Sequence, residues 1–290
     1  MKNFIVRTIT SVFFVATIVT CFLEPIAMMF LFAVVTGMTM WEYTGLVNEN
    51  VADTHVNRFI STAAGVFFFL AMAAFCCQLT NAVVFIPYLL TIVYLFVSEL
   101  YTGNKNAIND WAYTMLGQMY IALPMSMINV LAFREMAGET VFYFIAPLSV
   151  FIFLWVNDAG AYCVGSLIGK HKLFPRISPG KSWEGSIGGG ILVLVVAALI
   201  GWIEGNGFFP NDGGNGVVSM FGIPEWMGMG LVVVFFGTWG DLVESLFKRT
   251  MGIKDSGNIL PGHGGMLDRF DSTLMAFPAC VIYIYLLQML

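Results

Sequence analysis

The sequence predicts an all-α membrane protein that crosses the bilayer several times. Apolar residues make up 58% of the 290 residues and charged residues only 11%, whereas soluble domains contain about 45–50% and about 25%. Apolar runs long enough to span a bilayer recur along the chain. Lysine and arginine fall in alternate connections between these runs, which is typical of a multi-pass protein.

A membrane-spanning helix needs about 20 mostly apolar residues. We expect about nine such helices, over residues 4–23, 26–46, 59–79, 83–102, 112–133, 140–157, 185–204, 226–247 and 271–290. The connections near 24–25, 80–82 and 134–139 are short, so the helices that they join should be antiparallel neighbours.

The basic residues predict how the chain is oriented. With the N-terminus in the cytoplasm and the side alternating at each span, all but one of the 13 Lys and Arg residues fall on the cytoplasmic side. Only Arg134 lies outside. The opposite orientation would violate the positive-inside rule. We therefore expect the C-terminus outside, and a multi-pass location in the cell inner (cytoplasmic) membrane.

Charge is distributed unevenly between the two halves of the chain. Residues 1–150 are predicted to be a transmembrane scaffold whose notable polar residues lie near helix ends, where solvation is cheap: Glu42, Glu99 and Asp110. Residues 151–290 are predicted to form the catalytic region, because most of the basic residues lie in or beside two cytoplasmic connections, 158–184 and 248–270. A polyanionic substrate should therefore be met on the cytoplasmic side.

A polar stripe is predicted on one helix. If residues 241–249 are helical, positions i, i+3, i+4 and i+7 share a face, and they hold Asp241, Glu244, Ser245 and Lys248. Such a stripe should face a hydrated cavity or other helices rather than lipid. For Asp241 we favour a functional role. For Glu244 and Arg249, a snorkelling helix end with intrahelical ion pairs explains the pattern equally well.

Asp268 and Asp271 are three residues apart and should project from one face of a helix start. Carboxylates at this spacing suit Mg²⁺, which prefers oxygen ligands and keeps some waters for substrate phosphates. Helix capping is the alternative, although it explains one acid better than two. Asp158 is expected at a similar membrane depth to Asp241 and Asp271, so these three carboxylates could gather round one or two metal ions.

Two glycine-containing loops could contact phosphates. Residues 261–265 read Pro-Gly-His-Gly-Gly, and glycines let backbone N–H groups approach an anion. His263 could bind phosphate or move a proton there, although a lone loop histidine is usually just solvated. Residues 180–182 read Gly-Lys-Ser, but Pro175 stands where a P-loop needs glycine. We therefore predict only a phosphate-binding lysine, Lys181, and helix packing for Gly185 and Gly189.

From residue 245 to residue 271 the chain reads S-x-x-K-R, then K-D, then H-G-G-x-x-D-R-x-D. The residues are Ser245, Lys248, Arg249, Lys254, Asp255, His263, Gly264, Gly265, Asp268, Arg269 and Asp271. This pattern resembles the signature of the phosphatidate cytidylyltransferases, also called CDP-diacylglycerol synthases. Segments 157–162 and 178–185 also look like the family's bacterial members, whereas the N-terminal half matches only in hydropathy.

The resemblance implies an enzyme that transfers CMP from CTP to phosphatidate, with pyrophosphate as the other product, for phospholipid synthesis. It implies Mg²⁺, with a second cation such as K⁺, phosphatidate drawn from the inner leaflet, and a homodimer; no nucleic acid is expected. The implied catalytic residues are Asp241, Lys248, Arg249, His263, Asp268 and Asp271. The implied metal ligands are Asp158, Asp241, Asp268 and Asp271. Substrate contacts are expected from Ser178, Lys181, Ser182, Ser245, Lys254, Gly264, Gly265 and Arg269, with Glu184 a weaker candidate.

Two other functions remain open from the sequence. A CTP-dependent lipid kinase would transfer the γ-phosphate of CTP with similar residues. A membrane transporter would also use intramembrane acids and glycine-broken helices, but it should carry matching features in two halves. This chain carries its polar features in one half only, which favours an enzyme.

Overall fold

The computed structural model describes residues 2–136, 138–207, 221–257, 259 and 264–289. Its α-helices are α1 (Lys2–Phe22), α2 (Pro25–Asn50), α3 (Arg58–Cys76), α4 (Ile86–Thr102), α5 (Ala107–Gly117), α6 (Leu123–Ala132), α7 (Ile145–Ile168), α8 (Trp183–Gly205), α9 (Ile223–Thr250) and α10 (Leu267–Met289). A 3-10 turn, η1 (Ala82–Phe85), leads into α4, and a π-helical turn, η2 (Gln118–Ala122), joins α5 to α6.

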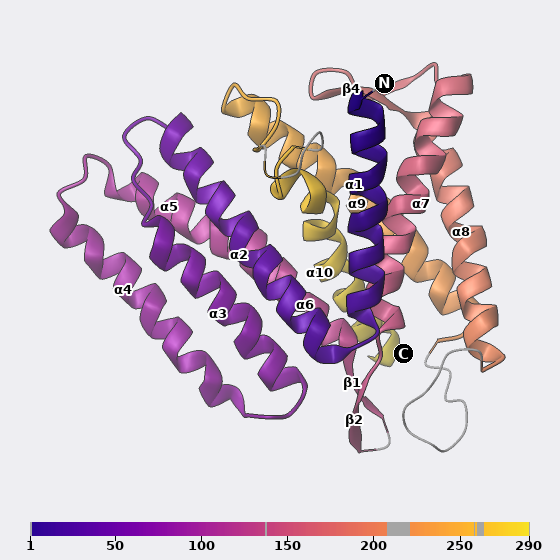
Figure 1. The fold of residues 1–290 in the computed structure, drawn as a ribbon, viewed down its shortest axis with the longest axis horizontal. Helices are drawn as coiled ribbons and strands as arrows, with labels where there is room; N and C mark the ends of the chain where they lie inside the picture. Colours follow the sequence, from indigo (N-terminus) through magenta and orange to yellow (C-terminus); the bar gives the residue numbers. More distant parts are fainter. Residues whose placement is uncertain (1, 137, 208–220, 258, 260–263, 290) are drawn as a thin grey trace.

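The predicted fold class is confirmed. Eight helical segments of the described chain are long and apolar enough to cross a membrane, and α1 adds a shorter apolar stretch over Thr8–Phe22. Each predicted span overlaps one of these segments; α5, η2 and α6 together form one apolar segment, Ala107–Ala132. Helix α1 begins and α10 ends at opposite ends of the bundle (Figure 1), as an odd number of crossings requires.

Several helices begin at residues that are typical of helix N-termini. Asn57, Asn106 and Ser182 each accept a hydrogen bond from the backbone N–H three residues later. These bonds cap α3, α5 and α8 by satisfying a donor that the helix itself leaves free. Pro25 and Pro224 lie in the first turns of α2 and α9, where the missing proline N–H costs nothing.

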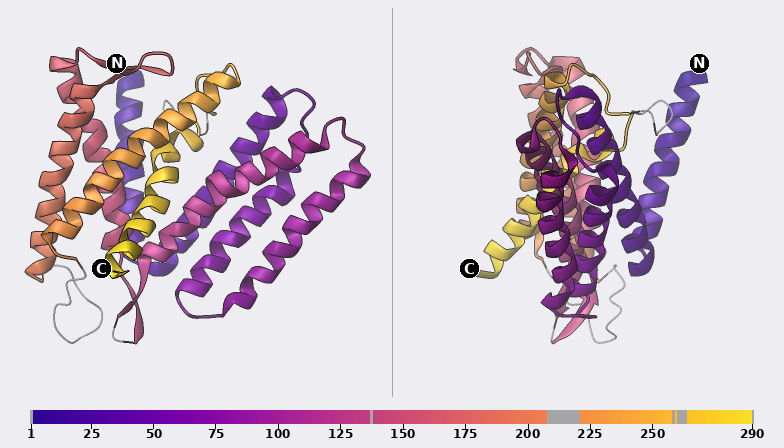
Figure 2. Two further views of the ribbon diagram at one scale, coloured as in Figure 1. Left: turned by 180° about the vertical axis from the view of Figure 1, so that it is seen from behind. Right: turned by 90° about the vertical axis from the view of Figure 1, so that its left-hand side faces the viewer.

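The helices form two groups that meet where α10 packs against α6. Helices α2 to α6 make up the N-terminal group, and α7, α8 and α9 pack together in the other (Figures 1 and 2). Helix α1 lies against the second group, where its Phe14 contacts Phe270 and its Phe22 contacts Phe151. The aromatic core at this junction consists of Phe22, Phe32, Phe151, Phe270 and Phe277.

Two short hairpins and one longer helix differ from the prediction. Strands β1 (Phe133–Met136) and β2 (Glu139–Phe142) pair at one end of the bundle, and β3 (Lys172–Phe174) and β4 (Ser178–Ser182) pair at the other. Helix α7 continues to Ile168, well past the predicted end of the sixth span at residue 157. The connection after it is therefore shorter than the predicted 158–184.

Glycines of α8 allow this helix to pack closely against α7. A Cβ on Gly189 would lie 2.6 Å from the carbonyl oxygen of Asn157, and a Cβ on Gly185 would lie 2.7 Å from that of Ala161. Because only glycine permits this approach, the packing role predicted for Gly185 and Gly189 is confirmed. The contact also fixes the position of Asp158, which neighbours Asn157 on α7.

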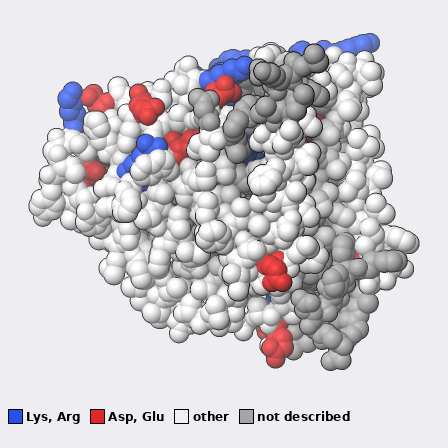
Figure 3. Space-filling model, viewed as in Figure 1, with Lys and Arg blue, Asp and Glu red and all other residues white. Residues whose placement is uncertain are grey.

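Basic residues gather at one end of the molecule. The connections that follow α2, α4, α7 and α9 all lie at the end where α1 begins (Figure 1). On the face shown in Figure 3, the blue Lys and Arg side chains crowd this upper end. Arg134 lies on β1, at the opposite end. The path of the chain therefore agrees with the alternation of charge, whereas the orientation in a membrane stays a prediction.

Candidate active site

A cavity of about 490 Å³ lies among α1, α7, α9 and α10, near the basic end of the bundle. Its charged lining consists of Asp158, Asp241, Lys248, Asp255, Asp268, Arg269 and Asp271. Its apolar lining comes from α1 and α7 and consists of Phe14, Val15, Phe151, Leu154 and Trp155. The cavity is therefore amphipathic, with most of its charges supplied by α9 and α10.

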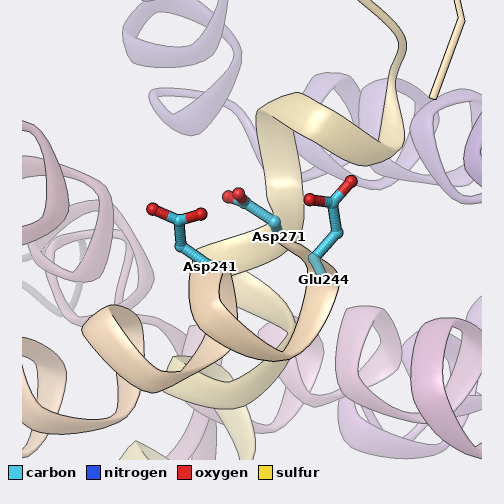
Figure 4. A group of neighbouring side chains, drawn as sticks. All are labelled: Asp241, Glu244 and Asp271. Atoms are coloured by element: carbon cyan, nitrogen blue, oxygen red, sulfur yellow. The ribbon is translucent and has the colours of Figure 1, made fainter. Parts of the chain in front are cut away.

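Three carboxylates converge beside this cavity. Asp241 and Glu244 come from α9 and Asp271 from α10, and one oxygen of each lies within 4.8 Å of the others. Figure 4 shows the three side chains side by side across the contact of the two helices. Glu244 is fully buried, and its Oε1 has no hydrogen-bond partner. A buried, unsatisfied carboxylate oxygen in such a group is the arrangement expected where a cation binds.

A glycine allows the two helices to bring these acids together. A Cβ on Gly240 would lie 2.8 Å from the carbonyl oxygen of Asp271 and 3.0 Å from the Cα of Ser272. Helices α9 and α10 can therefore approach backbone to backbone at this level. As a result, Asp241 and Asp271 lie next to each other although they are on different helices.

Two lysines balance part of the negative charge. The Lys181 Nζ lies 2.5 Å from Asp241 Oδ2, which ties the β3–β4 hairpin to α9. The Lys248 Nζ lies 2.6 Å from both Glu244 Oε2 and Asp268 Oδ1. Because the Lys248 side chain is only 12% exposed, water screens the attraction between these charges less than it would at the surface.

Asp268 organises the loop that precedes α10. Its Oδ2 accepts hydrogen bonds from the backbone N–H groups of Ser256 and Gly265, both at 2.9 Å. Its Oδ1 contacts Lys248. In the described part of the chain Asp268 lines the cavity but is not one of the three convergent acids, so its predicted role as a metal ligand stays a prediction.

Glu42 is a site residue that the sequence reasoning missed. It was expected near a solvated helix end, but it is buried and lies 214 residues from its partner Ser256, whose hydroxyl donates to Glu42 Oε1. Backbone N–H groups of Met266 and Leu267 donate to it at 2.9 and 3.0 Å. Glu42 thereby caps the N-terminus of α10 from another helix, because an acid is stabilised there. Nothing local in the sequence around Glu42 indicates this contact.

The expectation that residues 1–150 form only a scaffold needs correction for a second reason. Thr10, Ser11, Phe14 and Val15 of α1 line the cavity together with the acids of α9 and α10. This role could not be predicted from the sequence, because a hydrophobic helix that lines a cavity has the same apolar pattern as one that faces lipid.

The other predicted residues lie at varying distances from the convergent acids. Asp158 and Arg269 line the cavity, and the Ser245 hydroxyl donates to Asp241 Oδ1 at 3.2 Å. Arg249 and Lys254 are exposed and do not line it. Gly264 has a left-handed φ of +83° next to Asp268, and Gly265 is buried against Glu42 and Ser256. His263 lies outside the described residues.

The residues predicted around Lys181 lie on β4, directly before α8. Ser182 is its N-cap and accepts from the Gly185 N–H at 3.2 Å, which accounts for its position without a ligand. Lys181 and Ser182 also line a smaller cavity of about 270 Å³ that shares Asp158 with the first. Ser178 lies on β4. Glu184 accepts hydrogen bonds from the backbone N–H groups of Lys170 and His171, so it holds the connection after α7 rather than the cavity.

Comparison with known proteins connects this geometry to a family. The model of the cytidylyltransferase family matches residues 5–287. A phosphatidate cytidylyltransferase of Staphylococcus aureus (strain COL) is 39% identical over 178 residues, which cover 60% of this chain and 59% of that protein. One of Staphylococcus haemolyticus is 38% identical over 188 residues (64% and 63%), and one of Haemophilus influenzae is 45% identical over 131 residues (45% and 42%). The chain thus aligns with about three fifths or less of each relative.

Proposed function

This chain belongs to the cytidylyltransferase family, and we propose that it transfers CMP from CTP to phosphatidate, giving CDP-diacylglycerol and pyrophosphate. The names of the similar proteins support this substrate pair. The observation that carries the proposal is the amphipathic cavity in which Asp158, Asp241 and Asp271 meet Lys248 and Arg269. Such a cavity suits a substrate with a phosphate head and apolar tails together with a second polyanion.

The donor set fits a divalent cation such as Mg²⁺. Asp241, Glu244 and Asp271 offer carboxylate oxygens within 4.8 Å of one another, and Glu244 Oε1 is buried without a hydrogen-bond partner. We propose that these three residues hold the metal, with Asp158 and Asp268 nearby as further candidates. When bound, the ion would neutralise phosphate charge and help align the displacement.

The chemistry needs positioning more than it needs a base. The phosphate monoester of phosphatidate has a second pKa of about 6 and is mostly dianionic at pH 7. One of its oxygens forms a bond to the α-phosphorus of CTP while the bond from that phosphorus to the bridging oxygen of pyrophosphate breaks. The obstacle is the repulsion between two polyanions. Lys248 and Arg269 line the cavity, and Lys181 contacts its rim at Asp241, so these cations would bind phosphate oxygens.

The apolar lining supports entry of the lipid from within the membrane. Phe14 and Val15 of α1 face the same cavity as Phe151 and Trp155 of α7, so acyl chains could lie between these helices while the phosphate reaches the charged residues. CTP, which is fully water-soluble, would come from the end that carries the basic connections. By the charge distribution, that end is proposed to face the cytoplasm.

Further features of the proposal rest on the family resemblance. They are a second cation such as K⁺, a homodimer, and a location in the cytoplasmic membrane of a bacterial cell. The multi-pass character itself follows from the helices. Arg249, Lys254 and His263 keep their predicted phosphate-binding and leaving-group roles as proposals.

A labelling experiment with the purified full chain tests the reaction. With phosphatidate, Mg²⁺ and CTP labelled at the α-phosphate, the label should appear in the lipid, and chelation of Mg²⁺ should abolish its incorporation. CTP labelled at the γ-phosphate should leave the lipid unlabelled and yield labelled pyrophosphate. Asp271→Asn serves as the inactive control, since it removes one of the convergent charges.

The lipid-kinase alternative makes the opposite forecast for the two labels. Transfer of the γ-label to the lipid, with none from the α-position, would establish a kinase. Absence of both labels from the lipid, with the chain folded and Mg²⁺ saturating, would remove both enzymatic assignments. The gathering of the cavity's charges at one end of the bundle favours an enzyme over a transporter, which needs polar groups along a path through the bilayer.

A further inference from the structure

A second large cavity lies at the end of the molecule opposite the candidate active site. It measures about 980 Å³ and is bordered by the end of α3, the connection 77–81, the β1–β2 hairpin and the last turns of α10. Its polar lining consists of Gln78, Thr80, Asn81, Arg134, Glu135, Thr140, Tyr285 and Gln288. The β1–β2 hairpin and the end of α10 are at the lower end in Figure 1, away from the start of α1. The proposed reaction does not use this space.

Arg134 is the unusual residue of this cavity. It is 6% exposed, its Nη2 has no hydrogen-bond partner, and no ion pair reaches it from the described residues. Burial lowers the pKa of its guanidinium, and the neighbouring Tyr285 and Tyr143 only partly offset this. A buried cation without an anion is strongly unfavourable, so a structure that retains one usually meets an anion there.

Other groups around Arg134 point to the same conclusion. The Thr140 hydroxyl, on the paired strand, is also buried without a hydrogen-bond partner. Phe75 and Tyr285 line the cavity and are 42% and 48% exposed. A ligand here would therefore meet an unpaired guanidinium as well as exposed aromatic rings.

We propose that this cavity binds the head group of a membrane phospholipid, with the phosphodiester on Arg134 and the acyl chains along Phe75 and Tyr285. Guanidinium groups form strong charge-assisted hydrogen bonds with phosphate oxygens. Glu135 lines the exposed part of the same cavity. A head group that also carries an amine, such as phosphoethanolamine, therefore matches both charges better than a purely anionic one.

The test measures thermal stabilisation of the delipidated full chain in detergent. Dioctanoyl-phosphatidylethanolamine should raise the unfolding midpoint, dioctanoylglycerol, which lacks the phosphate, should not, and dioctanoyl-phosphatidylglycerol should raise it less. O-Phosphoethanolamine without acyl chains should give little effect. An equal shift with this soluble phosphoester would assign the site to a free phosphate compound and overturn the lipid assignment. Equal shifts with and without the lipid phosphate would overturn the proposal altogether.

Arg134→Gln locates the effect, with Arg176→Gln as the matched control. Arg176 is an exposed arginine at the other end of the molecule and lines neither cavity. In Arg134→Gln, at least ten times more lipid should be needed to reach the same shift of the unfolding midpoint. In Arg176→Gln, the lipid concentration needed should be unchanged. Without lipid, Arg134→Gln should be as stable as the natural chain or more so, because it removes an unpaired buried charge. A full lipid response in Arg134→Gln would contradict the proposal, and if this variant does not fold, the lipid series on the natural chain still decides it.

Discussion

Glu244 has the most constrained surroundings of the three convergent acids. It is fully buried, one oxygen contacts Lys248, and the other has no hydrogen-bond partner. From the sequence, a functional role facing a hydrated cavity and an intrahelical ion pair explained Glu244 equally well, and Glu244 was not among the predicted metal ligands. The structure contains the intrahelical pair with Lys248 and also places Glu244 beside Asp241 and Asp271. Both explanations therefore have support, and a substitution can separate them.

Glu244→Gln is expected to raise the Mg²⁺ concentration needed for half-maximal CMP transfer by about 10- to 100-fold. The amide keeps the volume of the side chain but offers one neutral oxygen to the cation. A Mg²⁺ titration of the rate measures the effect, with Glu225→Gln as control, since Glu225 is a half-buried acid in the first turn of the same helix, at the end opposite Glu244. An unchanged Mg²⁺ dependence in Glu244→Gln would exclude Glu244 as a metal ligand and leave the ion pair with Lys248 as its role.

Glu42 shows how a single carboxylate can position a loop. Its two oxygens accept hydrogen bonds from Ser256, Met266 and Leu267. Through Ser256 and Gly265, the same loop is bonded to Asp268. Asp268 in turn holds Lys248, so Glu42 acts on the cavity through the loop and without touching it.

Glu42→Gln should lower the stability of the chain by about 1–3 kcal/mol, because its amide nitrogen would face a backbone donor. The rate of CMP transfer should fall about tenfold or more, with a larger effect on kcat than on the KM for CTP. Steady-state kinetics and a thermal midpoint measure the two effects. The control is Glu49→Gln on the same helix, where the acid is exposed. Loss of stability with unchanged kinetics would reduce Glu42 to a purely structural residue.

At the scale of elements, close contacts between helix pairs place the acids. Gly189 brings α8 against α7 at Asn157, next to Asp158, and Gly240 brings α9 against α10 at Asp271. Each contact lies within a residue of a carboxylate that lines the cavity. The spacing of the acids therefore depends on helix separations that only glycine allows.

Gly189→Ala should destabilise the chain by about 1–3 kcal/mol, because the new Cβ overlaps the backbone of α7. It should also lower activity, since α7 carries Asp158. Gly205→Ala, in the same helix, is the matched control, because a Cβ there has no atom within 4 Å. Its stability should change by less than about 0.5 kcal/mol. Thermal unfolding in detergent compares the stability of the two variants. Equal stability would show that α7 and α8 can move apart at this contact without cost.

At the scale of the whole molecule, charge and topology agree. The connections after α2, α4, α7 and α9 share one end, and the β1–β2 hairpin with Arg134 lies at the other (Figure 1). The candidate active site is near the first end and the proposed lipid site at the second. The two leaflets should therefore meet chemically different ends of the molecule.

Orientation can be measured with single cysteines introduced after the five native cysteines have been replaced. In intact cells, a membrane-impermeant thiol reagent should label Glu139→Cys, in the β1–β2 hairpin, and should not label Lys105→Cys, between α4 and α5. After permeabilisation both should react. Both side chains are exposed, so access depends on the side of the membrane. The reverse labelling pattern would invert the proposed topology and place the candidate active site outside.

The sequence by itself determined the fold class, the approximate spans and the charged motif of α9 and α10. Hydrophobic runs and the alternation of basic residues are local or cumulative signals, and the bilayer constrains both directly. The polar stripe from Asp241 to Lys248 was predictable for the same reason, since helical spacing alone puts its members on one face.

Only the tertiary structure decided which distant groups meet. Three features depend on contacts between segments that are far apart in the sequence. Glu42 contacts Ser256, residues of α1 line the cavity, and Arg134 is buried without a partner for its Nη2. A buried glutamate and a solvated one are identical in sequence. A buried carboxylate is tolerated only where other groups pair with it, because an unpaired charge away from water is costly in free energy. The fold decides which groups lie close enough to do so.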